Sequence, residues 1–380
     1  MSTFAFQVAS PRGQGTVALV NSQVMDELVS VREQVQAALA TYLSQARSHL
    51  TTIGSQLSPV CDGLEEFILD GGKRLRPLFA YAGHKAAGKE VGAAEIKAFA
   101  SLEFLQACAL IHDDLMDASD TRRGKPAMHR RFENLHQEQA LAGLSDQFGA
   151  ASAILLGDLA LVQSDHMLHT SGISSDQLLD ALSVHDEMRI ELMAGQYLDV
   201  REAGEKSFNV ERSLRIARFK SGKYSIERPL HLGATIALRD PAVRTPLTWR
   251  LSEYGLPLGE AFQLRDDLLG IFGDPAVTGK PAGDDLREGK RTVLMAMAME
   301  RTTDAGRKEL STYLGNPDLS PEIIEKLRGI INESGAVESV EGLIEKLTFD
   351  ALTASRSEEI APDSHELLAA LAASATARKS

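Results

Sequence analysis

The chain has 380 residues and a formal net charge of −13, and 43% of its residues are hydrophobic while only 5% are aromatic. Nucleic acid as a general partner is disfavoured, because phosphate backbones select basic surfaces, although a local basic pocket for a small phosphate compound is not excluded. The sequence contains no apolar run of the ~18 residues that a membrane-spanning helix needs. Cys61 and Cys108 lie far apart without metal-ligand spacing, which favours a cytoplasmic protein without disulfides.

The residue pattern predicts an all-α protein. Residues 1–23 contain Pro11, Gly13 and Gly15 and are expected to form a flexible leader ahead of one helical domain at 24–380. Apolar residues then recur at helical spacing, with Gly, Pro, Asn, Asp or Ser between the stretches. The predicted helices are 25–50, 59–69, 75–88, 93–117, 146–168, 175–203, 210–237, 246–272, 286–301, 305–314, 321–334, 337–353 and 362–376. No internal repeat is present, so a single large helical bundle is the simplest architecture.

A first acidic cluster, ALIHDDLMD, ends a strongly apolar helix. Its Asp113 and Asp117 are one helical turn apart, with Asp114 beside them, so the carboxylates of Asp113 and Asp117 lie on one face. Like charges repel there, and a hard divalent cation with oxygen ligands would offset that repulsion. The alternative is an ordinary solvated helix end.

A second acidic cluster, EAFQLRDDLLGIFGD, places Asp266 and Asp267 among apolar neighbours of another predicted helix. One aspartate pair could be an ordinary solvated helix end. Two such pairs, both at positions where core packing is expected, are harder to explain in that way. In a bundle they would face one another across a cavity, as metal-binding carboxylates do in other bundles.

Four short segments supply positive charge: GGKRLRP, SDTRRGKP, RFKSGKYS and GKPAGDDLREGKRT. Arg binds phosphate oxygens in pairs, whereas Lys acts as a mobile point charge. For each segment alone, ordinary solvated surface charge is the better explanation, but together with the two acidic clusters the four segments predict a diphosphate pocket. The cations in question are Lys73, Arg74, Arg76, Arg122, Arg123, Lys220, Lys223, Lys280 and Lys290.

These segments stand, from about Leu69 to Thr292, in the order found in the trans-isoprenyl diphosphate synthase (polyprenyl synthetase) family, which the chain resembles. It looks most like the bacterial geranylgeranyl-type members. The resemblance implies an all-α bundle around a deep central cavity, a homodimer and three Mg²⁺ ions. It also implies head-to-tail condensation of isopentenyl diphosphate with an allylic diphosphate (dimethylallyl, geranyl or farnesyl).

The resemblance also assigns roles to single residues. Catalysis is expected to depend most directly on Asp113, Asp114, Lys220 and Asp266. Metal ions would be held by Asp113, Asp114, Asp117, Asp266 and Asp267. Arg122 and Lys220 would contact the allylic diphosphate, and Lys73, Arg76 and Arg123 the isopentenyl diphosphate. Gln106, Gln263, Lys280 and Lys290 would line the same site, flanked by Gln196 and Asp199.

The sequence departs from the family pattern at two positions. Gly270 stands where many relatives carry the last aspartate of the second motif, but by the resemblance the first two aspartates carry most of the metal ligation, so activity is still expected. Gln106 stands where many relatives carry a histidine that touches isopentenyl diphosphate, and an amide can still donate to phosphate.

Small residues before the first motif bear on product length. Ala109 and Cys108 lie one turn before Asp113, and Leu105 lies a further turn down, where it could begin a floor. Farnesyl-making relatives often carry a bulky aromatic residue at one of the first two positions, so the resemblance predicts a longer product here, geranylgeranyl diphosphate. The alternative is that both are simply compact core residues.

Three other functions share some of these features. A terpene cyclase binds one diphosphate and needs no second basic set, so Lys73, Arg76 and Arg123 argue against it. A non-catalytic or regulatory subunit of a heteromeric synthase typically loses its acidic motifs, whereas this chain retains both. A metal phosphohydrolase using His112 and Asp113 lacks further evident histidine ligands.

Overall fold

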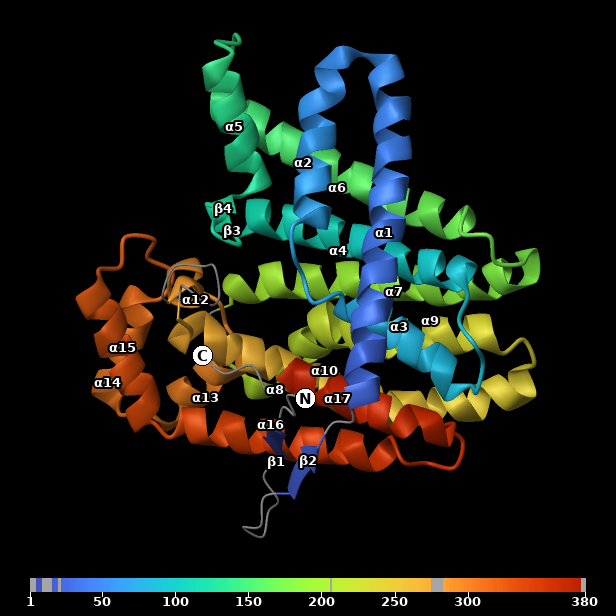
Figure 1. Ribbon diagram of the computed structural model, residues 1–380. Coiled ribbons are helices and arrows are strands. Elements are labelled where there is room, and N and C mark those ends of the chain that lie inside the picture. The colour runs from blue at the N-terminus through green and yellow to red at the C-terminus, as the bar shows by residue number, and fades with distance from the viewer. Residues whose placement is uncertain (1–4, 9–15, 20–21, 206, 275–282, 377–380) are drawn as a thin grey trace.

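The computed structural model of the protein describes residues 5–8, 16–19, 22–205, 207–274 and 283–376, and these are almost entirely helical (Figure 1). The predicted all-α fold class is confirmed. The helices are α1 Ser22–Ile53, η1 Ser55–Leu57, α2 Ser58–Leu69, α3 Leu75–Ala86, α4 Ala93–Met116, α5 Met128–Glu138, α6 Ser145–His169, α7 Ser175–Ala203, α8 Val210–Ile216, η2 Ala217–Glu227, α9 Arg228–Ala237, α10 Pro241–Phe272, α12 Asp284–Glu288, α13 Val293–Arg301, α14 Asp304–Tyr313, α15 Pro321–Glu333, α16 Ala336–Ala354, η3 Pro362–Ser364 and α17 His365–Thr376.

The described strands form two small antiparallel pairs. β1 (Ala5–Val8) pairs with β2 (Thr16–Leu19), inside the segment expected to be a flexible leader. β3 (Thr121–Arg122) pairs with β4 (Lys125–Pro126) directly after α4. Neither pair was predicted from the sequence.

Helix ends follow the sequence where a capping residue fixes them. The hydroxyl of Ser174 accepts a hydrogen bond from the Gln177 backbone N–H, and the Gln177 side chain accepts one from the Ser174 N–H, so α7 begins at the predicted residue. The segment 210–237, predicted as one helix, instead contains α8, the π-helix η2 and α9. Helix α5 was not predicted, and the predicted 286–301 helix is divided between α12 and α13, with Gly289 at φ 73° between them.

Apolar packing holds the bundle together in two clusters. The larger one surrounds Leu39, Phe79, Phe104 and Tyr254, all completely buried. The second surrounds Leu294 and packs the C-terminal end of α10 against α13, α15 and α16. Both ends of α10 are therefore fixed in the core, which gives the second acidic motif a rigid support.

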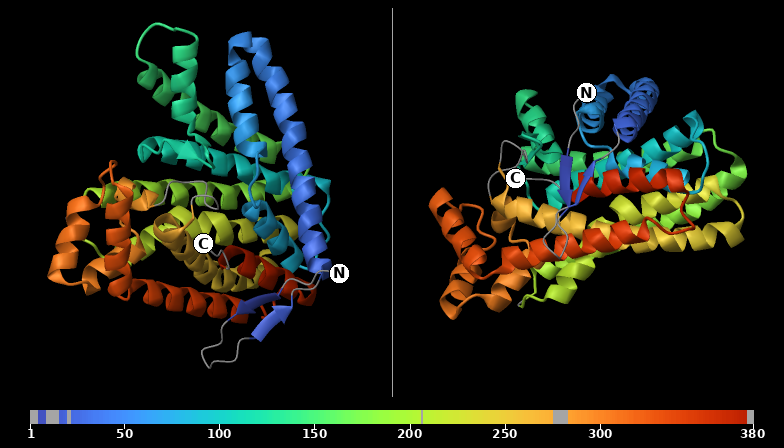
Figure 2. Two further views of the ribbon diagram at one scale, coloured as in Figure 1. Left: turned by 60° about the vertical axis from the view of Figure 1, so that its left-hand side comes forward. Right: turned by 60° about the horizontal axis from the view of Figure 1, so that its bottom comes forward.

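The chain arrangement brings distant segments to one end of the bundle. Helices α1 and α2 form an antiparallel pair that projects from stacked layers containing α4, α6, α7 and α10 (Figures 1 and 2). The hairpin β3–β4 after α4 lies at the same end of the bundle as α12 (Figure 1). None of the described helices combines the length and the apolar character needed to cross a membrane.

Candidate active site

The first acidic motif meets the KSG segment. Lys220 Nζ lies 2.8 Å from Asp113 Oδ1 and 2.6 Å from Asp199 Oδ2. Gln196 on α7 also donates to Asp113 Oδ1, at 2.8 Å. Three helical segments thus place their polar side chains around one carboxylate.

The charges in this group stabilise one another. Burial by itself raises the pKa of Asp113, but Lys220 and Lys290 outweigh it and hold that pKa below its usual range. Burial lowers the pKa of Lys220, yet Asp113 and Asp199 outweigh it and raise that pKa above its usual value. Lys220 therefore carries a full positive charge at neutral pH.

The π-helix η2 positions Lys220 through two close backbone contacts. A Cβ added at Gly195 of α7 would lie 2.3 Å from the backbone nitrogen of Lys220. On the other side, a Cβ at Gly259 of α10 would lie 2.6 Å from the Cα of Gly222. Only glycine permits these approaches, and π-turns of this kind often occur at functional sites.

Asp117 lies beside the last of the basic segments. Lys290 Nζ is 3.2 Å from Asp117 Oδ2, 3.9 Å from Asp285 Oδ1 and 2.6 Å from Glu288 Oε2. Ser119, just after the first motif, donates to the other oxygen of Glu288. Lys290 thus joins the end of α4 to α12.

Asp114 and Arg122 form an ion pair. The guanidinium Nε donates to Asp114 Oδ1 at 2.9 Å, and a second nitrogen contacts the same carboxylate. The Asp114 side chain is completely buried. Asp114, predicted to hold a metal ion, and Arg122, predicted to contact a phosphate, therefore neutralise each other's charge in the absence of ligands.

The second motif presents Asp267 from the end of α10. Gln263, one turn earlier, donates to Asp267 Oδ1 at 2.8 Å. Burial raises the pKa of Asp267 to about 8, and Asp285 and Asp266 act in the same direction. Because burial disfavours the charged form of this carboxyl group, a cation bound next to it would stabilise the carboxylate.

Arg76 on α3 and Arg123 in the turn after β3, both predicted to bind isopentenyl diphosphate, have different surroundings. Arg76 is buried, donates to Ser225 Oγ at 2.7 Å and stacks over the Tyr224 ring at 4.2 Å. Arg123 donates to the carbonyls of Phe67 and Asp70, at 3.1 and 3.0 Å, and so caps the C-terminal end of α2.

Arg74 has a structural role. Its guanidinium donates to Glu103, Gln36 and the Ile68 carbonyl, each at 2.6 Å, and the residue is buried. Lys73, next to it, is exposed on the loop before α3. Gln106 lies half-buried on α4, and Lys280 lies outside the described residues.

The three positions proposed to set product length differ in burial. Cys108 and Leu105 are completely buried, and the Cys108 sulfur lies 3.8 Å from His112 Nδ1. Ala109 is only partly buried and, four residues before Asp113, shares its helix face.

His112 packs between helices. Its Nε2 lies 3.1 Å from the Ile154 carbonyl of α6, and a Cβ on Gly157 would lie 2.0 Å from the same nitrogen. This contact gives no support to the phosphohydrolase alternative.

The acidic residues do not by themselves form a closed metal cage. Among the described residues, no group of three or more His, Cys, Asp or Glu side chains is close enough to hold a metal ion. The donor chemistry nevertheless fits magnesium, because all the candidate ligands are carboxylate oxygens. Asp117 Oδ2 is buried, and the ammonium of Lys290 lies 3.2 Å from it, so a cation already occupies the position where a metal ion would bind this oxygen.

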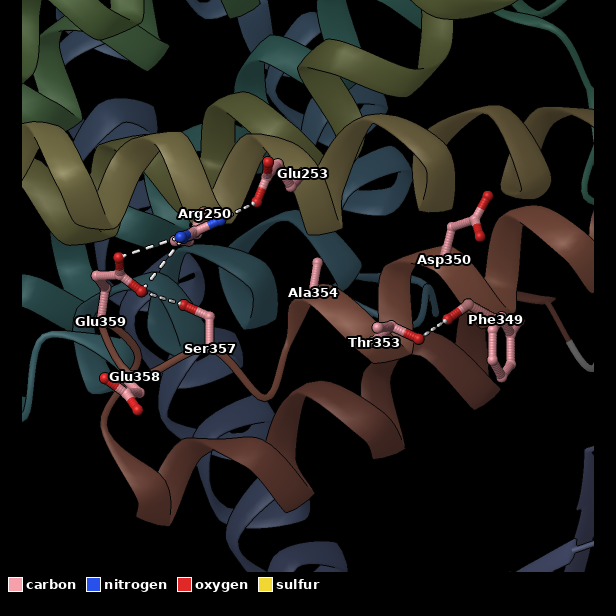
Figure 3. Close-up of a pocket in the computed structure, with 9 residues that line it drawn as sticks. All are labelled: Arg250, Glu253, Phe349, Asp350, Thr353, Ala354, Ser357, Glu358 and Glu359. Atoms are coloured by element: carbon pink, nitrogen blue, oxygen red, sulfur yellow. Dashed lines mark hydrogen bonds and ion pairs between the residues drawn. The ribbon is translucent and has the colours of Figure 1, made fainter.

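A separate surface groove of about 630 Å³ lies between α10 and the C-terminal end of α16 (Figure 3). Arg250 crosses it and pairs with Glu253 at 2.8 Å and Glu359 at 3.2 Å. The groove contains none of the residues predicted for the site, so its size alone does not identify a functional site.

An all-α bundle with an aspartate-rich motif near the end of each of two helices, and with lysines that contact the first motif, has the features of the isoprenoid synthase-type class. The sequence model of the polyprenyl synthetase family matches residues 59–331. The chain belongs to this family, and its enzyme class is that of the prenyl diphosphate synthases, as the sequence predicted.

Similar proteins agree with this assignment. A geranylfarnesyl diphosphate synthase from Aeropyrum pernix is 34% identical over 275 residues, covering 71% of this chain and 79% of that protein. A geranylgeranyl diphosphate synthase from Saccharolobus solfataricus is 31% identical over 266 residues, covering 69% and 73%. A crystal structure of geranylgeranyl pyrophosphate synthase from Corynebacterium glutamicum, complexed with isoprenyl diphosphate and magnesium, has a TM-score of 0.87 and 42% identity, covering 92% of this chain and 99% of that one. The cyclase and regulatory-subunit alternatives are not favoured.

Sequence reasoning missed two residues of this site. Glu288 and Ser119 connect α12 to the loop after α4. Glu288 stands between Asp285 and Lys290 in the GDDLREGK segment, so its place in that segment was the available signal.

Proposed function

We propose that the protein condenses isopentenyl diphosphate with an allylic diphosphate, in a magnesium-dependent reaction, to give geranylgeranyl diphosphate. The observation that supports this most directly is that Lys290 contacts both Asp117 and Asp285. Asp285 in turn acts electrostatically on Asp267 of the second motif, so Lys290 and Asp285 together link the two acidic regions. A diphosphate with its metal ions, three by resemblance to the family, would dock where these charges now neutralise one another.

The chain's own residues supply binding and orientation. Magnesium, when bound, contributes positive charge to the leaving diphosphate. Lys220 and Lys290, both held protonated by neighbouring carboxylates, would donate to phosphate oxygens of the bound diphosphate. Lys73, Arg76 and Arg123 form the proposed second set for isopentenyl diphosphate.

The bond changes balance without a redox partner. The allylic carbon–oxygen bond breaks, the double bond of isopentenyl diphosphate forms the new carbon–carbon bond, and one proton leaves. No histidine or glutamate is assigned as the base, since the released diphosphate can accept that proton. Apolar side chains around α4 would shield the cation from water.

Product length rests on the face of α4 below Asp113. Ala109 is small and partly buried on that face, so an extending chain meets no bulky residue one turn below the motif. Because the similar proteins include both geranylfarnesyl and geranylgeranyl synthases, this local feature supports a product longer than farnesyl diphosphate.

We further propose a homodimer formed through α6 and α7. Arg189 on α7 pairs with Asp165 on α6 at 2.6 Å, which holds the two helices together. Their outer faces expose large apolar side chains that a second copy would cover. These are Ile154, Leu155, Val162, Leu179, Ile190, Met193, Tyr197 and Val200.

The reaction is tested by incubating the purified protein with radiolabelled isopentenyl diphosphate, each allylic primer and Mg²⁺, followed by mass spectrometry of the products. We expect a twenty-carbon diphosphate and no product in excess EDTA. Failure to incorporate the label would contradict the proposal. A cyclase does not use isopentenyl diphosphate, and a non-catalytic subunit on its own would not incorporate it either.

A further inference from the structure

The second acidic motif has a glycine at the position where many relatives carry its last aspartate, and the space above this glycine is filled. A Cβ built on Gly270 would lie 2.0 Å from Asp285 Oδ2 and 2.3 Å from Asp285 Cγ. These distances are far below ordinary van der Waals contact. A side chain at residue 270 and the observed position of Asp285 therefore exclude one another.

Asp285 is held in this position by its own element. It belongs to the short helix α12 and is only 8% exposed. Its backbone carbonyl accepts a hydrogen bond from the Lys290 N–H at 3.0 Å, and the next residue, Leu286, is completely buried and accepts from the Gly315 N–H at 2.8 Å. The carboxylate over Gly270 is thus placed by a packed element.

The Asp285 carboxylate also lies among the charges of the site. Its Oδ1 is 3.9 Å from Lys290 Nζ, the same ammonium that contacts Asp117. Asp285 is also one of the charges that act on Asp267 of the second motif. It therefore lies between the end of α10 and the cation that joins the two motifs.

We propose that Asp285 supplies, from α12, the carboxylate that residue 270 lacks, and that it is a positioning residue for Lys290 and for the metal-binding end of α10. The motif is then complete in space although it is interrupted in sequence. This inference rests on the proposed function, because it concerns the same magnesium–diphosphate site. It predicts that the carboxylate can be moved back to residue 270 only if Asp285 is removed at the same time.

The test measures binding of inorganic pyrophosphate by isothermal titration calorimetry at a series of Mg²⁺ concentrations, with thermal unfolding of the ligand-free protein as a check on folding. Asp285→Asn keeps the shape and removes the charge, and we expect it to weaken Mg²⁺-dependent binding about 10- to 100-fold. Asp284→Asn is the matched control, because neighbouring helix residues lie on different faces, and it should bind within about threefold of wild type.

Moving the carboxylate from residue 285 to residue 270 distinguishes a need for the carboxylate itself from a need for a side chain that fills the space. Asp285→Gly should bind as weakly as Asp285→Asn, and Gly270→Asp combined with Asp285→Gly should recover most of the wild-type affinity. Wild-type affinity in Asp285→Asn, or a folded double variant no better than Asp285→Gly, would overturn the inference alone. A wild-type protein that shows no Mg²⁺-dependent pyrophosphate binding would instead overturn the proposed function and this inference with it.

Discussion

Lys220 Nζ lies 2.8 Å from Asp113 Oδ1, although the two residues are 107 positions apart in the chain. Asp199 holds the same ammonium from the other side at 2.6 Å. The pair lies where magnesium and diphosphate are proposed to bind, so the ligand-free protein already contains opposite charges at the right places. Ligands would exchange these partners rather than create a new charged pocket.

Replacement of Asp113 should remove catalysis without unfolding the protein. In Asp113→Ala, Lys220 keeps its contact with Asp199, so no unpaired buried charge is left and the fold should survive. We expect kcat to fall about a hundredfold or more, because charge stabilisation at the leaving group is lost. The measurement is label incorporation together with thermal unfolding, with Asp304→Asn, at a fully exposed carboxylate, as control. Normal turnover in Asp113→Ala would exclude the assigned role.

A methyl group at Gly195 should displace Lys220. The added Cβ would lie 2.3 Å from the Lys220 backbone nitrogen, so η2 must move. A shift of about 1 Å can cost as much as 100-fold in rate, and we expect Gly195→Ala to lower kcat about 10- to 100-fold. Gly233→Ala is the control, because its Cβ would lie 1.8 Å from the Ala80 carbonyl in a contact between α9 and α3. Equal losses of activity in both variants would indicate general destabilisation instead.

A bulky residue at position 109 should shorten the product. Ala109 is partly buried on the face of Asp113, whereas Cys108 is completely buried beside His112. Ala109→Phe should therefore block the extending chain with less damage to the core than Cys108→Phe. Mass spectrometry should show a shift toward farnesyl diphosphate as the product, while the rate at which farnesyl diphosphate is formed is retained. An unchanged product would place the growing chain elsewhere.

A charge on the outer face of α7 should separate the proposed homodimer. Ile190 is 69% exposed in the single chain, and a second copy would bury it without a partner for a carboxylate. Ile190→Glu should elute as a monomer in size-exclusion chromatography with light scattering. Trp249→Glu, at a 66% exposed residue of α10 outside this face, should leave the assembly unchanged. A wild-type monomer would rule out the proposed interface.

Acid should destabilise the protein partly through His231. Burial, reinforced by Arg228, lowers the pKa of His231 to about 3. Since the unfolded chain binds that proton near its usual pKa of about 6.5, stability is lost as the pH falls below that value toward 3. Between pH 7.5 and 5 this group contributes a loss of about 2 kcal/mol.

The measurement is urea unfolding of wild type and His231→Asn at both pH values. We expect His231→Asn to be less stable than wild type at pH 7.5 but to lose less of its stability on acidification. His136→Asn serves as the comparison. Parallel pH dependence in wild type and His231→Asn would contradict the assignment.

Local patterns predicted most of the helices because their causes are local. The start of α7 follows from the Ser174–Gln177 capping pair, and the end of α2 from the Gly71–Gly72 pair that comes after it. The π-helix η2 was not predictable in this way. Its form depends on the contacts of Gly195 and Gly259 with segments far away in the chain.

The sequence by itself determined the fold class and the family, and it predicted which residues would carry the chemistry: two aspartate pairs and four basic segments in a recognisable order. Only the tertiary structure decided how they are used. It made Arg74 a structural residue paired with Glu103, brought Lys290 between Asp117 and Asp285, and put the Asp285 carboxylate over Gly270. The physical reason is that residue type fixes charge and hydrogen-bonding capacity, whereas the partner of a buried charge depends on which distant helices pack together.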